Sequence, residues 1–178
     1  MNTVSTSGVR GDRDWYLEHL TADVERFATA VRRGPLEAPI SGCPDWDLRK
    51  LTTHMGVVHR WDAEHATGPT TPIDPELASD GIDEYLDLVM RHNVTRDSVT
   101  LPAGSLHIHC TDAHGEWLVS LDEGYQLERA HAKGAAALRG PAEALLLRLW
   151  NRDTERADEL SPVGDESVLD AWLAVSTP

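Results

Sequence analysis

Three histidines and two carboxylates lie within twelve residues of one segment, residues 54–65. The histidines are His54, His59 and His65, and the carboxylates are Asp62 and Glu64. Histidine is the commonest side-chain metal ligand and the usual proton carrier near neutral pH. The segment therefore has two interpretations. It could bind a metal or transfer protons, or its histidines could simply be hydrogen-bonded at the edge of a core.

The spacing of these residues on a helix decides which of them can act together. At about 100° per residue, His54, Trp61 and His65 fall on one stripe, and Asp62 lies beside it. His59 is turned roughly 140° away from His54. His59 and Asp62 can share an ion, whereas His54 must meet them from a displaced position or from another helix. One helix alone does not make a convincing three-ligand site, so His54, His59 and Asp62 are candidate metal ligands, and locally hydrogen-bonded histidines are the alternative.

A second group of histidines lies in a predicted strand. His107 and His109 share one face of that strand, and Asp112 and His114 follow closely. Such a group is typical of a small metal site, but a solvated sheet face has the same pattern. Both interpretations stay open at this point.

The sequence offers few candidate residues for binding an anion or for acting as a nucleophile. His131 and Lys133 could contact an anionic ligand, or could belong to an exposed hairpin edge. Cys110 fits a small buried hydrophobic residue, and Cys43 has no evident activating neighbour. The sequence contains no glycine-rich phosphate loop, dinucleotide fingerprint, zinc-finger cysteine pairs or Gly-x-Ser-x-Gly turn.

The apolar pattern divides the chain into a helical front and a mixed back. Steps of three and four residues predict helices over 14–33, from a cap at Asp45 or Asp47 to about 67, and over 76–92, 142–151 and 165–175. Loops are predicted over 37–44 and 93–105. Alternation predicts strands over 106–111, 117–121, 125–131 and 135–139.

These elements predict an α+β fold in three parts. A partial helical bundle spans 1–68, a linker with a connecting helix spans 69–104, and a small antiparallel sheet with packed helices spans 105–178.

The composition limits which binding partners and which cellular compartment we expect for this protein. The chain has 178 residues and a formal net charge of −14. This excess of carboxylates argues against binding to nucleic acid or to an anionic membrane surface. No apolar run is long enough for a membrane span, and the polar N-terminus has no signal core. We therefore expect a cytoplasmic protein that acts on a small molecule.

Short motifs along the whole chain match one family pattern. They are Asp14-Trp-Tyr-Leu, Cys43-Pro-Asp-Trp46-Asp-Leu, His54-Met-Gly-Val-Val-His59-Arg-Trp, Leu106-His-Ile-His109, Gly115-Glu-Trp-Leu118, His131-Ala-Lys-Gly134 and Leu138-Arg-Gly-Pro141. These motifs resemble the mycothiol-dependent maleylpyruvate isomerase family. The resemblance implies a DinB-like, metal-binding helical domain followed by a small α+β domain similar to sterol carrier proteins.

The chain departs from this family in its helical part. Family members hold the metal with an early histidine and with a glutamate and a histidine of a later, similar helix. Here one helix begins like the early motif and ends like the later one. The resemblance therefore maps His54 and His59 onto the two metal histidines but places Met55 at the glutamate position. A thioether does not replace a carboxylate for a hard or borderline cation.

The same departure predicts a homodimer. Two long front helices cannot close a four-helix core alone, whereas a symmetric dimer could rebuild the bundle with two helices from each chain. Such a dimer could bring His54, His59 and Asp62 of both chains near one axis.

Two functions follow from these observations. The first is a metal- and thiol-dependent isomerase or transferase-like enzyme acting on a small organic substrate, with zinc as the expected divalent metal and mycothiol implied by the resemblance. The second is a metal-free small-molecule-binding protein, or a repurposed enzyme, with an apolar cavity lined by Trp61, Trp117, Trp150 and Leu146. An inert dimeric remnant is the third alternative. The predicted ligand-binding residues are Trp61, His65 and Trp117, and the sequence singles out no catalytic residue.

Overall fold

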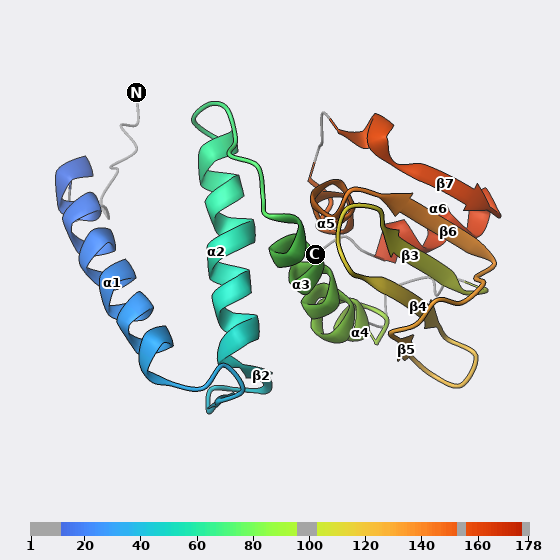
Figure 1. Cartoon of the computed structure of the whole chain (residues 1–178), viewed down its shortest axis with the longest axis horizontal. Coiled ribbons are helices and arrows are strands. Elements are labelled where there is room, and N and C mark those ends of the chain that lie inside the picture. Colours follow the sequence, from blue (N-terminus) through green and yellow to red (C-terminus); the bar gives the residue numbers. More distant parts are fainter. Residues whose placement is uncertain (1–11, 96–102, 153–155, 176–178) are drawn as a thin grey trace, which may run out of the picture. The chain divides into compact units, whose positions relative to one another are not determined.

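The computed structural model describes residues 12–95, 103–152 and 156–175, and the chain divides into two units after Arg49 (Figure 1). The predicted polar N-terminus, residues 1–11, and most of the predicted loop over 93–105 lie outside the described residues. The predicted three-part division stays a prediction.

The first unit contains one long helix and a small hairpin. The helix α1 (Arg13–Arg33) begins after Asp12, whose carboxylate accepts a hydrogen bond from the Trp15 N–H, and it ends at Gly34. The strands β1 (Pro39–Ile40) and β2 (Cys43–Asp47) pair antiparallel, so they occupy part of the predicted loop over 37–44 and extend past the predicted cap at Asp45. The prediction of the helix is confirmed, and the hairpin was missed because its first strand has only two residues.

The helix α2 (Leu48–His65) carries the histidine segment. Its buried face consists of Thr53, Val57, Val58 and Trp61, so this face is rotated about the helix axis relative to the predicted stripe. His65 is exposed, and its ring stacks on the Trp61 ring with centroids 4.6 Å apart.

A second long helical stretch was predicted as one helix and contains three segments. These are α3 (Pro75–Glu84), a π-helical segment (Tyr85–Met90) and α4 (Arg91–Asn93). π-Turns inside helices are frequent at functional sites because the extra residue re-aims neighbouring side chains. This π-helical segment begins directly after Glu84, a buried carboxylate.

Asp74 starts this stretch, and its removal gives a simple test of the local fold. Its carboxylate accepts hydrogen bonds from the Glu76 and Leu77 N–H groups, both at 3.1 Å. The substitution Asp74→Ala is expected to lower the free energy of unfolding by about 1 kcal/mol, because two N–H groups lose their acceptor. Urea denaturation followed by circular dichroism measures the change. Asp74→Asn keeps an acceptor and should cost much less, and an equal loss in both variants would contradict the capping role.

The back of the chain forms one five-stranded sheet with helices packed on it (Figure 1). Its strands are β3 (Leu106–Cys110), β4 (Glu116–Ser120), β5 (Gln126–Glu128), β6 (Ala136–Gly140) and β7 (Ser161–Gly164). Its helices are α5 (Ala142–Leu149), a 3-10 turn (Ala157–Glu159) and α6 (Glu166–Val175). The predicted α+β fold is confirmed.

The sheet is mixed, whereas the sequence predicted an antiparallel one. The strand order is β5-β4-β3-β6-β7, and β3 and β6 pair in parallel. Since β5 runs in the same direction as β3, the segment 129–135 must return along the sheet before β6 begins. This return places His131 beside β3, with its ring centroid 5.6 Å from that of His107.

The core lies between the sheet and the helices of the second unit. Leu106, Ile108 and Val119 are fully buried on the helix-facing side of the sheet, and Leu145 and Trp172 of the helices are fully buried as well. The strand residues that alternate with them, including His107 and His109, point to the opposite face. One face of the sheet thus builds the core, and the other is left for polar side chains.

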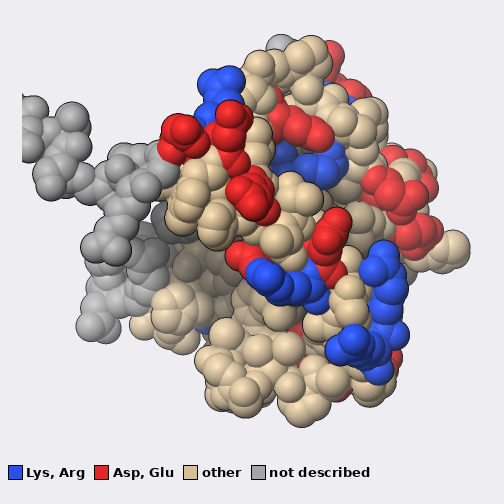
Figure 2. Space-filling model, turned by 90° about the vertical axis from the view of Figure 1, so that its left-hand side faces the viewer, with Lys and Arg blue, Asp and Glu red and all other residues tan. Residues whose placement is uncertain are grey.

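The helices and the charged surface bear on whether the chain could meet a membrane. Among the described residues, no helix has both the length and the apolar character needed to cross a membrane. On the face shown in Figure 2, basic and acidic side chains lie next to one another.

Candidate functional site

The first candidate site lies where α2 meets the end of α3. The Nδ1 atom of His54 is 3.1 Å from Oε1 of Glu84, and the Glu84 side chain is only 3% exposed. The His59 ring packs edge-on against the His54 ring, with centroids 4.8 Å apart. The Trp150 ring lies on another side of His54, at 5.8 Å. The structure thus joins His54 to a buried carboxylate that belongs to a different helix.

Asp62, the third predicted metal ligand, is held by a different partner. The Arg152 guanidinium donates to both carboxylate oxygens, at 2.8 and 2.6 Å. This hydrogen bonding lowers the pKa of Asp62 below its usual value. The nearest approach of His59 is 4.0 Å, from Nδ1 to Oδ2 of Asp62. The three predicted ligands therefore do not converge on one point within α2.

The predicted ligand-binding residues lie on separate elements with separate partners. Trp61 is buried and stacks on His65, which is exposed. Trp117 lies on β4, and its indole N–H donates to Oδ1 of Asp83 at 2.8 Å. Trp150, which was predicted to line the same cavity, packs edge-on against Tyr85 with ring centroids 5.1 Å apart. Their role in ligand binding stays a prediction.

A second group of chemically competent residues lies on the polar face of the sheet. The residues His107, His109 and His131 surround the carboxylate of Glu116, and we call these four residues the sheet cluster. The distances to Glu116 are 3.4 Å from His107 Nε2, 2.8 Å from His109 Nδ1 and 2.5 Å from His131 Nδ1. The four potential ligand atoms all lie within 4.8 Å of one another.

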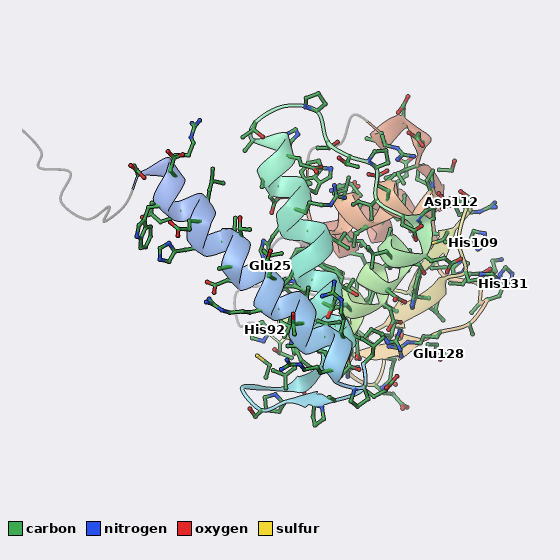
Figure 3. The ribbon with its side chains drawn as sticks, turned by 60° about the vertical axis from the view of Figure 1, so that its left-hand side comes forward. Glu25, His92, His109, Asp112, Glu128 and His131 are labelled. Atoms are coloured by element: carbon green, nitrogen blue, oxygen red, sulfur yellow. The ribbon has the colours of Figure 1, made fainter. Side chains whose placement is uncertain are left out.

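The strand pairing explains why these side chains meet. His109 lies directly opposite Glu116 in the β3–β4 hairpin, and His107 is on the same face two residues earlier. His131 comes from the return segment that leads into β6. Figure 3 shows His109 and His131 side by side at this face, and their ring centroids are 6.5 Å apart.

Burial and charge act against each other in the sheet cluster. Burial lowers the pKa of His107, although the negative charge of Glu116 opposes this shift. Burial alone would raise the pKa of Glu116, but hydrogen bonding from His131 and the charges of the imidazoles hold it below its usual value. The cluster therefore favours an ionised carboxylate next to a neutral, ligand-competent His107.

A pocket of about 300 Å³ adjoins the sheet cluster. His107, His131 and Lys133 line it, and the rest of its wall is mostly glycine and alanine. Gly134 is required at this wall, because a Cβ atom there would lie 2.5 Å from the Ala136 carbonyl oxygen. The predicted pair of His131 and Lys133 is thus brought together at one small pocket.

The sequence located part of the sheet cluster and missed its centre. Of the four residues first considered near this strand, His107 and His109 join the cluster. His114 instead lies 3.3 Å from Glu76, and Asp112 accepts a hydrogen bond from the Ala142 N–H. Glu116 was missed, although a hairpin between the two predicted strands places it opposite His109. Glu84 was missed as well, and no local signal connects it with His54.

The back of the chain is similar to a known protein family. A family model described as the MDMPI C-terminal domain matches residues 76–171, which is more than half of the chain. The chain belongs to the MDMPI C-terminal domain family. This finding confirms the resemblance to maleylpyruvate isomerases for the back of the chain.

The matched domain contains the whole of one candidate site and part of the other. The matched MDMPI residues run from α3 into α6, so they include Glu84 and the whole sheet cluster. They do not include α2, which carries His54 and His59. The DinB-like character of the front of the chain stays a prediction.

A solved structure titled "UbiJ-SCP2 Ubiquinone synthesis protein" also matches this MDMPI chain. The two sequences are 16% identical, the match covers 56% of this chain and 93% of that chain, and the TM-score is 0.36. No curated protein matches the sequence.

Proposed function

We propose that this chain is a metal- and thiol-dependent enzyme of the maleylpyruvate isomerase type, acting on a small organic substrate. The observation that carries the proposal is the contact between His54 and the buried carboxylate of Glu84. A carboxylate in direct contact with the histidine supplies the donor that the sequence lacks at Met55. The family membership of the matched domain supports the same class of reaction.

The donor atoms of this site fit a borderline divalent cation. Two ligands of a tetrahedral zinc ion, each about 2.0–2.1 Å from it, lie about 3.3 Å apart. His54 Nδ1 and Glu84 Oε1 are 3.1 Å apart, which agrees with that separation. His59 packs edge-on against His54, so it would have to turn toward Glu84 to become the third ligand. His54 and Glu84 would therefore hold the metal, and His59 would join them once its ring turns toward Glu84, in place of the predicted trio with Asp62.

The surrounding residues would orient these ligands. Arg152 fixes Asp62 with two hydrogen bonds, and this carboxylate places its negative charge 4.0 Å from His59 Nδ1. Trp150 lies against the His54 ring and limits its rotation. When bound, the cation supplies Lewis acidity to a substrate oxygen or lowers the pKa of a thiol. The thiol is mycothiol, as the resemblance implies.

The test combines metal content with activity. We expect Glu84→Gln and His54→Ala to lose the metal of this site and to slow the mycothiol-dependent isomerisation of maleylpyruvate at least 100-fold, because each removes a ligand. Metal is measured by mass spectrometry of the purified chain, and turnover by ultraviolet absorbance with and without mycothiol.

Matched controls exist within the chain. Glu76→Gln changes an exposed carboxylate of the same helix, and His92→Ala changes an exposed histidine of α4. Both should keep the wild-type metal content and rate. An unchanged rate in the folded Glu84→Gln variant would refute the proposal.

A further inference from the structure

We propose that the sheet cluster is a second, structural site for a zinc-class divalent cation. It is separate from the site at His54 and Glu84, and it ties β3 and β4 to the return segment 129–135. Within the described part of the chain, the sheet cluster is the group of at least three histidines and carboxylates whose ligand atoms already lie within 4.8 Å of one another.

Without a cation, the sheet cluster holds buried polar atoms at an energetic cost. The side chain of His107 is 9% exposed, and those of His109 and Glu116 are 22% and 26% exposed. Within the described residues, His107 Nε2 and His109 Nδ1 are buried and form no hydrogen bond of normal geometry, although both face Glu116. Burying such groups is unfavourable unless they are hydrogen-bonded or bound to a metal. A cation at their centre would satisfy both.

The donor atoms of the sheet cluster are those that zinc prefers. Three imidazole nitrogens and one carboxylate oxygen match the preference of zinc and similar ions, whereas calcium and magnesium prefer oxygen ligands alone. Four protein ligands also complete a tetrahedral shell, which is the pattern of structural zinc sites. The set therefore predicts a tightly held structural ion.

The paired strands hold most of the donor atoms of the sheet cluster in fixed positions. Three of the four donors lie on two paired strands, with His109 opposite Glu116 in the ladder. Strands position ligands more accurately than loops do. The fourth donor, His131, has an 82% exposed side chain on the return segment and already contacts Glu116. An ion bound to all four would fasten this segment to the sheet.

A solvated sheet face is the competing explanation for these histidines. It predicts imidazoles as exposed as that of His114, whose side chain is fully exposed. The burial of His107 and the shared carboxylate differ from that pattern. The structure therefore favours the metal site over the solvated face.

The experiment uses the full chain carrying Glu84→Gln, so that the site at His54 cannot contribute. The protein is freed of metal by chelation and dialysis, and zinc chloride is added in a calorimetric titration and in thermal denaturation. We expect one equivalent of zinc to bind and to raise the melting temperature, because an ion that binds only the folded state stabilises it. Cobalt substitution should give the intense visible absorption of a tetrahedral ion.

Variants in this background locate the ion. His109→Ala and Glu116→Gln should weaken zinc binding at least 100-fold, and His131→Gln at least 10-fold. The last variant changes an exposed side chain, so it keeps the test valid even if the buried variants fail to fold. His114→Ala is the matched control, and it should bind zinc like its parent.

The outcomes separate this inference from the proposed function. No zinc binding by the parent, or unchanged binding in His131→Gln and Glu116→Gln, would overturn the sheet site. Binding that depends on Glu116, together with unchanged isomerisation in Glu84→Gln, would support the sheet site and refute only the proposed function.

Discussion

Replacing Trp172 by alanine is expected to lower the free energy of unfolding by about 4 kcal/mol. Trp172 is 0% exposed and lies on α6, the helix that packs on β6, β3 and β7. Its removal would leave a large cavity between this helix and the sheet. The indole N–H would also be lost as a donor to the Gly104 carbonyl oxygen, which it contacts at 3.1 Å.

Urea denaturation followed by circular dichroism measures this loss. Trp172→Phe keeps most of the ring volume but removes the hydrogen bond, so its cost should be near 1–2 kcal/mol. A cost for Trp172→Ala no larger than that for Trp172→Phe would show that α6 does not depend on this side chain for its packing.

Much of the fold followed from hydrophobic periodicity alone. The apolar steps of the last helix predicted 165–175, and α6 spans Glu166–Val175 with Leu169 and Trp172 buried. The alternation of Leu106, Ile108 and Cys110 identified β3 and its inward face. These signals are local, because one face of a helix or strand must be apolar wherever it meets a core.

Strand order could not be predicted in the same way. Alternation shows which side chains of β6 point inward, but it does not show that β6 runs parallel to β3. That arrangement depends on the path of the return segment 129–135. The same path brings His131 to Glu116, so the sheet cluster could be only partly predicted from its two strand histidines.

The partners of the predicted metal ligands on α2 could not be predicted for a related reason. The sequence placed His54, His59 and Asp62 on one helix and sought their partners there. In the structure, His54 is paired with Glu84 of α3, and Asp62 is paired with Arg152, 90 residues later. Such pairs depend on tertiary packing, and spacing within one helix carries no information about them.

The second large effect is expected at the pair of His54 and Glu84. In metal-free protein, His54→Ala should lower the free energy of unfolding by about 3 kcal/mol, because it removes a partner from a carboxylate that is 3% exposed. Glu84→Gln should cost less, since the amide is neutral and can still contact the imidazole. In the double variant, no buried charge loses its partner, so its cost should be below the sum of the single costs.

A double-mutant cycle in urea, run with a chelator present, measures this coupling. We expect a coupling free energy of about 2 kcal/mol, in the range found for residues in direct contact. The pair of Arg60 and Glu64 on α2 is the matched control, because its side chains are more exposed and spaced four residues apart, and such pairs contribute about 0.3–0.5 kcal/mol. Equal coupling in the two pairs would mean that Glu84 is not held as a buried anion by His54, and the metal site proposed there would lose its carboxylate ligand.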